Sequence, residues 1–165
     1  MTSVQQTVYI ETSIVSYLTA RPSRDLITVA NQQITNEWWE NYRHQFNLYT
    51  SLAVLDEANQ GDKQAAEKRL KVLQSIPLLV FRPEMLDLAN EFMRQKALPQ
   101  KADEDAAHIA IATIYRLDYL LTWNCKHIAN AQIQKKMAKI STEKGYDLPT
   151  ICTPTELMGD LKDVD

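Results

Sequence analysis

Four side chains that carry oxygen atoms follow predicted strands or lie on the helices that come after them, at the places where an open parallel sheet gathers its functional groups. They are Glu11, Glu57, Asp105 and Asn124. The carboxyl ends of parallel strands meet at one edge, so we expect these side chains to share one crevice. Three carboxylates there would repel one another unless a cation held them, and Mg²⁺ and Mn²⁺ prefer oxygen ligands. The residue types therefore predict a divalent-metal site.

A divalent ion held by carboxylates indicates hydrolysis of a phosphodiester. One ion can acidify a bound water and neutralise a phosphate, and a second can stabilise the leaving oxygen. Each side chain also has a simpler interpretation. Glu11 could be a solvated strand-end acid, Glu57 a helix-surface acid, Asp105 an acid that complements a helix dipole, and Asn124 a turn residue.

Composition excludes several other chemistries. Only three glycines occur, far apart, so no glycine-rich phosphate loop and no GxSxG nucleophile elbow is present. Two distant cysteines cannot form a four-cysteine zinc site or a CxxC pair, and the three histidines form no HExxH motif. These counts leave an oxygen-ligand site as the strongest candidate.

The chain has 165 residues, with 45% hydrophobic and 24% charged side chains, which predicts one globular domain over 1–165. No basic leader and no apolar run of about 18 residues occurs, which predicts a soluble cytoplasmic protein. The net charge of −3 argues against a broadly basic surface that coats nucleic acid. A local basic patch remains compatible with this charge.

Strands and helices are predicted to alternate along the whole chain. Apolar, β-branched stretches predict strands over 4–10, 47–51, 78–81, 118–122 and 150–154. Helical spacing and breakers predict helices that start near 12–13 and cover 24–46, 52–60, 62–75, 84–98, 101–117 and 128–145. The hydroxyl pair Thr12-Ser13 can cap the first helix. This alternation predicts an α/β fold, with a mostly parallel sheet covered by helices on both faces.

Four segments that contain the oxygen-bearing residues resemble, in order, the motifs of PIN-domain nucleases, especially the bacterial VapC-type toxins. The segments are VYIETSIVSYL, SLAVLDEA, DEDAAHIAIA and YLLTWNCKHI, and the resemblance runs from about Val8 to Pro154. It implies a PIN-like three-layer α/β/α fold. It also implies a metal-dependent ribonuclease, the toxin of a type II toxin-antitoxin system, that forms a homodimer and is inhibited by a separately encoded antitoxin.

By this resemblance Glu11, Glu57 and Asp105 would bind Mg²⁺ or Mn²⁺, Asn124 would take the fourth position, and Ser13 would support the first motif by hydrogen bonding. Two residues depart from the family pattern. Glu11 stands where most members have Asp, and its extra methylene moves the carboxylate outward. Asn124 stands where Asp is frequent and brings no negative charge. A catalytically weak or inactive PIN-fold binding module is therefore the alternative function.

Other residues near these motifs have less specific roles. His108 lies three residues after Asp105 in an apolar stretch, and we expect a core histidine rather than a general base. Arg21, Arg24 and Lys126 could contact phosphates at the mouth of the crevice, as could His127, although a solvated surface explains them equally well. A third interpretation is a metal-dependent phosphatase or other hydrolase on a similar sheet, but no paired DxD nucleophile motif follows a predicted strand.

Overall fold

Four short parallel strands form the sheet, which confirms the predicted α/β class. The computed structural model describes residues 4–158, so both ends of the predicted domain 1–165 lie outside the described residues. The strands lie in the order β2-β1-β3-β4, and every neighbouring pair is parallel. They are β1 (Thr7–Ile10), β2 (Asn47–Tyr49), β3 (Tyr119–Leu121) and β4 (Thr150–Cys152).

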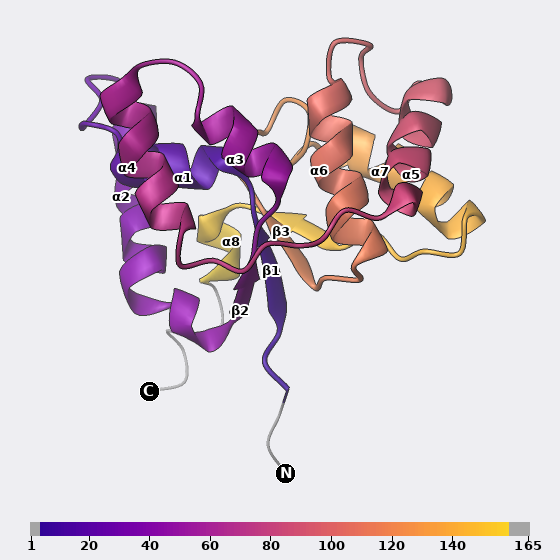
Figure 1. The fold of residues 1–165 in the computed structure, drawn as a ribbon, viewed down its shortest axis with the longest axis horizontal. Helices are drawn as coiled ribbons and strands as arrows, with labels where there is room; N and C mark the ends of the chain where they lie inside the picture. The colour runs from indigo at the N-terminus through magenta and orange to yellow at the C-terminus, as the bar shows by residue number, and fades with distance from the viewer. Residues whose placement is uncertain (1–3, 159–165) are drawn as a thin grey trace.

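Helices flank this sheet on both sides, with one group formed by the first half of the chain and another by the second half (Figure 1). The first group is α1 (Thr12–Thr19), α2 (Leu26–Asn41), α3 (Leu52–Ala58) and α4 (Lys63–Leu73), with a 3₁₀ turn over Arg43–Gln45. The second group is α5 (Pro83–Arg94), α6 (Asp103–Ile114) and α7 (Ala131–Glu143), and the short α8 (Pro154–Leu157) packs against α2. No helix within 4–158 has the length and apolarity needed to cross a membrane.

The two central strands place the candidate residues. Val8, Tyr9 and Ile10 of β1 are fully buried, as are Leu120 and Leu121 of β3, because helices cover both faces of a parallel sheet. The register sets Ile10 opposite Leu121, and the Glu11 amide donates to the Leu121 carbonyl at 3.2 Å. The residues that follow these two strands therefore lie side by side at the carboxyl edge of the sheet.

The strand predicted over 78–81 is wrong. Leu78 forms only an isolated bridge with Thr50, and Val80 and Phe81 are 73% and 61% exposed. The chain leaves the sheet edge at this point to begin α5 at Pro83, whose fixed φ suits a first helical turn. An apolar run alone does not distinguish a buried strand from an exposed apolar segment.

Two helix starts also differ from the prediction. Glu11 itself caps α1 by accepting from the Ser13 amide, in place of the hydroxyl pair. The helix predicted over 24–46 starts after its cap Asp25 and ends at Asn41, and its first predicted core residue, Leu26, is 82% exposed. The apolar spacing in α2 therefore predicted burial correctly at Trp38 and wrongly at Leu26.

The Asn130 side chain fixes the start of α7 by accepting from the amides of Gln132 and Ile133, both at 3.1 Å. We expect Asn130→Ala to lower the free energy of unfolding by about 1 kcal/mol, because these amides lose their acceptor. Asn130→Asp should retain most of the stability, since its carboxylate can accept both bonds. Urea denaturation of the two variants measures the difference, and equal losses would contradict a capping role.

Candidate metal centre

Glu11 is held at the end of β1 by three hydrogen bonds. Its side chain is buried and accepts from the Ser13 amide at 3.2 Å and the Ser13 hydroxyl at 2.5 Å. The hydroxyl of Thr122, which follows β3, donates to the same carboxylate at 2.5 Å. These donors replace the hydrogen bonds to water that the carboxylate loses on burial.

Glu57 is held by a chain of buried polar side chains. His108 Nε2 hydrogen-bonds to Glu57 Oε1, and Nδ1 of the same ring bonds the Tyr9 hydroxyl at 2.7 Å. The Tyr9 hydroxyl lies 2.8 Å from the Ser51 hydroxyl, which also caps the helix that carries Glu57. His108 is fully buried with both nitrogens bonded, as expected for a core histidine, but one partner is a predicted site residue.

Both carboxylate oxygens of Asp105, in the first turn of α6, bond to side chains of the loop that follows β3. Asn124 Nδ2 donates to Oδ1 at 3.1 Å, and His127 Nδ1 lies 3.0 Å from Oδ2. Asn124 Oδ1 accepts in turn from the His127 amide at 3.0 Å. The loop is thereby tied to the first turn of α6, and His127 faces an acid rather than open solvent.

The charges of three predicted site residues act on the imidazole of His108. Burial alone would lower the pKa of His108. The hydrogen bond with Glu57 and the negative charges of Glu11, Glu57 and Asp105 outweigh burial, so that the pKa of His108 is raised above its ordinary value. The predicted acids therefore lie in one region of negative charge rather than on separate surfaces.

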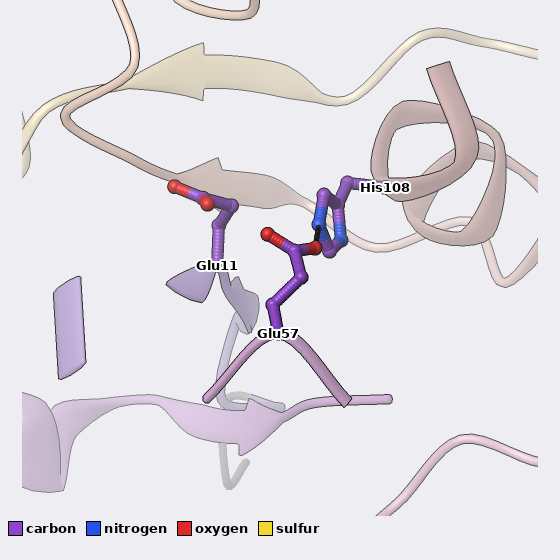
Figure 2. Close-up of side chains that lie close together, drawn as sticks. All are labelled: Glu11, Glu57 and His108. Carbon is purple, nitrogen blue, oxygen red and sulfur yellow. Dashed lines mark hydrogen bonds and ion pairs between the residues drawn. The ribbon is translucent and has the colours of Figure 1, made fainter. Parts of the chain in front are cut away.

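Three side chains in this region offer candidate ligand atoms for a cation. Glu11, Glu57 and His108 each offer one ligand atom, and these three atoms lie within 4.8 Å of one another. Figure 2 shows the three side chains close together. The donor set fits a divalent ion, since two carboxylates supply the charge and oxygen ligands that Mg²⁺ or Mn²⁺ takes. Asp105 lies outside this group of three in the described part of the chain, and its charge acts on the same imidazole.

The predicted phosphate contacts are not part of this cluster. Arg21 and Arg24 are exposed between α1 and α2, and Lys126 is exposed on the loop after β3. Among residues 4–158, no hydrogen bond or ion pair joins any of the three to the acids. Their contact with phosphate stays a prediction.

Sequence reasoning missed Thr122 and the role of Tyr9, and undervalued His108. Each had a signal. Tyr9 lies two residues before Glu11 on the same face of a strand, Thr122 precedes Asn124 by two, and His108 falls one helical turn after Asp105. These spacings place each residue near the site. They do not show which residue of another strand or helix it bonds, such as Glu11 for Thr122 and His108 for Tyr9.

The sequence matches no family model and no curated protein. Two solved structures are similar in fold. Mycobacterium tuberculosis VapC20, described as a Sarcin-Ricin loop cleaving toxin, is 16% identical with a TM-score of 0.57 and covers 72% of this chain and 91% of its own. Rickettsia felis VapBC2, bound to a DNA fragment from its promoter, is 14% identical with a TM-score of 0.51 and covers 90% of this chain and 98% of its own.

The chain has a PIN-like fold. The expected arrangement of a parallel sheet between helices is therefore confirmed. At these identities the likeness establishes the fold alone.

The buried bonds of His108 make a prediction about stability. We expect His108→Leu to lower the free energy of unfolding by about 2 to 4 kcal/mol, because Glu57 loses its donor and the Tyr9 hydroxyl loses one partner in the core. The exposed His44 offers a matched control, and His44→Leu should change stability little. Urea denaturation measures both, and similar losses in the two variants would contradict the buried network.

Proposed function

We propose that this chain is a divalent-metal-dependent ribonuclease, the toxin of a type II toxin-antitoxin system, that hydrolyses RNA phosphodiesters. The observation that carries the proposal is the cluster of Glu11, Glu57 and His108 at the carboxyl edge of a PIN-like sheet, with the charge of Asp105 acting on the same imidazole. The similarity in fold to VapC20, itself described as a toxin that cleaves the Sarcin-Ricin loop, adds support.

In this proposal Glu11, Glu57 and Asp105 hold Mg²⁺ or Mn²⁺. The ion would supply positive charge for the phosphate and acidify water for attack on phosphorus. Ser13 and Thr122 orient the Glu11 carboxylate, and His108 orients Glu57. Asn124 holds Asp105 in place by a hydrogen bond. Because asparagine is uncharged, the site has one negative charge fewer than it would have with an aspartate at position 124.

The geometry of Asn124 favours the alternative of a catalytically weak or inactive binding module. Its amide nitrogen donates to Asp105 and its oxygen accepts from the His127 amide, so both ends of the side chain already have protein partners. An asparagine engaged in this way is suited to holding a loop. The two functions differ in whether a divalent ion binds through the carboxylates.

The partner of such a toxin would be a separately encoded antitoxin. The similarity in fold to the VapBC2 structure supports this part of the proposal. The natural location for a ribonuclease with such a partner is the cytoplasm. Both statements rest on the toxin proposal.

The metal proposal predicts a loss of cleavage when single carboxylates are neutralised. We expect Glu11→Gln and Asp105→Asn each to reduce cleavage of RNA by about 100-fold or more, because charge stabilisation by a bound metal is worth several kcal/mol. Mn²⁺ affinity, measured by isothermal titration calorimetry, should fall in parallel. Asp103→Asn is the matched control, since Asp103 is exposed in the same first turn of α6.

Cleavage by Glu11→Gln at the wild-type rate in a nuclease-free preparation would overturn the proposal. Wild-type protein that binds Mn²⁺ no better than Glu11→Gln and does not cleave RNA would favour the binding module.

We also propose that the chain forms a homodimer through an apolar groove at the start of α5. The groove has a volume of about 220 Å³ and includes Leu52, Phe81 and Leu86, each more than half exposed. Val80 beside it is also exposed. Clustered exposed apolar side chains are characteristic of contact surfaces, and a second copy of the chain would cover this one.

The proposed dimer contact predicts that a single charged substitution in the groove separates the two copies. Phe81→Asp should convert a dimer of twice 18.9 kDa into a monomer, because a carboxylate would be buried in an apolar contact. Leu26→Asp is the control, since Leu26 is equally apolar, is more exposed, and lies on α2 away from the groove. Sedimentation velocity measures the mass, and a dimer that persists in Phe81→Asp places the contact elsewhere.

A further inference from the structure

A polar groove lies where the end of α5, the loop that leads to α6 and the start of α7 come together. These three helices stand together on one side of the molecule, and the α5–α6 loop extends beyond them (Figure 1). The groove has a volume of about 880 Å³.

The groove is positively charged in a chain whose net charge is −3. Arg94, Lys96 and Lys136 line it, and none of its lining residues within 4–158 is acidic. Arg94 is paired with Glu91 at 2.5 Å, so part of its charge is compensated. Lys96 and Lys136 are exposed and form no ion pair with the described residues, which leaves two ammonium groups for an anionic ligand.

The uncharged lining suits a nucleic acid strand. Gln100 and Gln132 carry amides that both donate and accept, as the edges of unpaired bases require. The oxygen of Asn130 caps α7, so this side chain offers only its amide nitrogen as a donor. Met93 and Ile133 add apolar surface for base faces. Grooves that bind single strands combine backbone-tracking cations with surface on which bases rest.

The walls of the groove continue into the segments that carry two candidate site residues. Gln100 lies just before α6, whose first turn contains Asp105. Asn130 ends the loop that begins at Asn124, whose carbonyl accepts from the Ile128 and Ala129 amides. Both walls of the groove are therefore continuous in sequence with the segments that carry Asp105 and Asn124.

We propose that this groove, defined by Lys96 and Lys136, binds the backbone of single-stranded RNA next to the candidate metal centre. The inference rests on the proposed ribonuclease function and deepens it by naming where the substrate strand lies. An acidic segment of a protein is the competing occupant. The combination of cations, amides and apolar surface on the way to a phosphodiester-cleaving site favours RNA.

Binding without metal tests the groove separately from catalysis. A fluorescently labelled single-stranded RNA of mixed sequence is titrated with full-length protein in EDTA, and anisotropy is followed as salt is raised. We expect the double variant Lys96→Gln/Lys136→Gln to bind roughly ten- to thirtyfold more weakly near 0.1 M salt, with a salt slope smaller by about 1.4, because each lost phosphate contact removes about 0.7.

Lys63→Gln/Lys68→Gln is the matched control, since both lysines are exposed on α4, in the other group of helices. It removes the same charge and should bind RNA as the wild type does. Because Lys96 has φ of 56°, circular dichroism and the single variant Lys136→Gln check that any loss reflects charge rather than folding. The single variant should show about half of the change in salt slope.

Equal RNA affinity and equal salt slope in the groove and control variants would overturn the proposal. It would also be overturned if wild type failed to bind RNA, or if an oligoglutamate of equal charge bound the groove as tightly as RNA. Weaker binding confined to the groove variants supports the groove even where wild type cleaves nothing with Mg²⁺ or Mn²⁺, an outcome that counts against the proposed function alone.

Discussion

The candidate site depends on holding Glu11 close to Glu57, with the charge of Asp105 acting on the same imidazole, without letting the repulsion open the fold. Each acid has donors of its own. Glu11 accepts from Ser13 and Thr122, Glu57 is bonded to His108, and Asp105 is bonded to Asn124 and His127. Hydrogen bonds to a charged carboxylate offset part of the desolvation that burial imposes. The negative charge that would attract a metal is thereby built into the resting structure.

Most of these donors come from a different element than the acid they hold. Thr122 reaches Glu11 because the register of β1 and β3 sets Ile10 opposite Leu121, which brings the next residues of both strands together. His108 on α6 reaches Glu57 on α3, although 51 positions separate them. The pairing of β1 with β3 and the packing of α6 against α3 therefore create the site, and no single segment contains it.

The origin of the acids and their donors in different elements explains what the sequence could and could not predict. The positions of Glu11 and Asp105 follow from local rules, since one ends a strand and the other begins a helix in an alternating α/β chain. The bonds of Tyr9 and Thr122 depend on long-range pairing that spacing does not encode. Residues 78–81 show the opposite error, because a local apolar pattern suggested a buried strand where the folded chain leaves Val80 and Phe81 exposed.

Acidic and basic side chains are separated in this chain, and for a nucleic acid ligand this separation matters more than the net charge of −3. Acids concentrate around His108, where they would repel phosphate without a cation, while Lys96 and Lys136 line a groove without acids among its described lining residues. A phosphate backbone would be drawn to the groove first, since unscreened attraction acts over about 10 Å at 0.1 M salt. A cation at the acids would then reverse the local field where cleavage has to occur. Overall acidity therefore argues against broad coating of nucleic acid and is compatible with guidance of one strand.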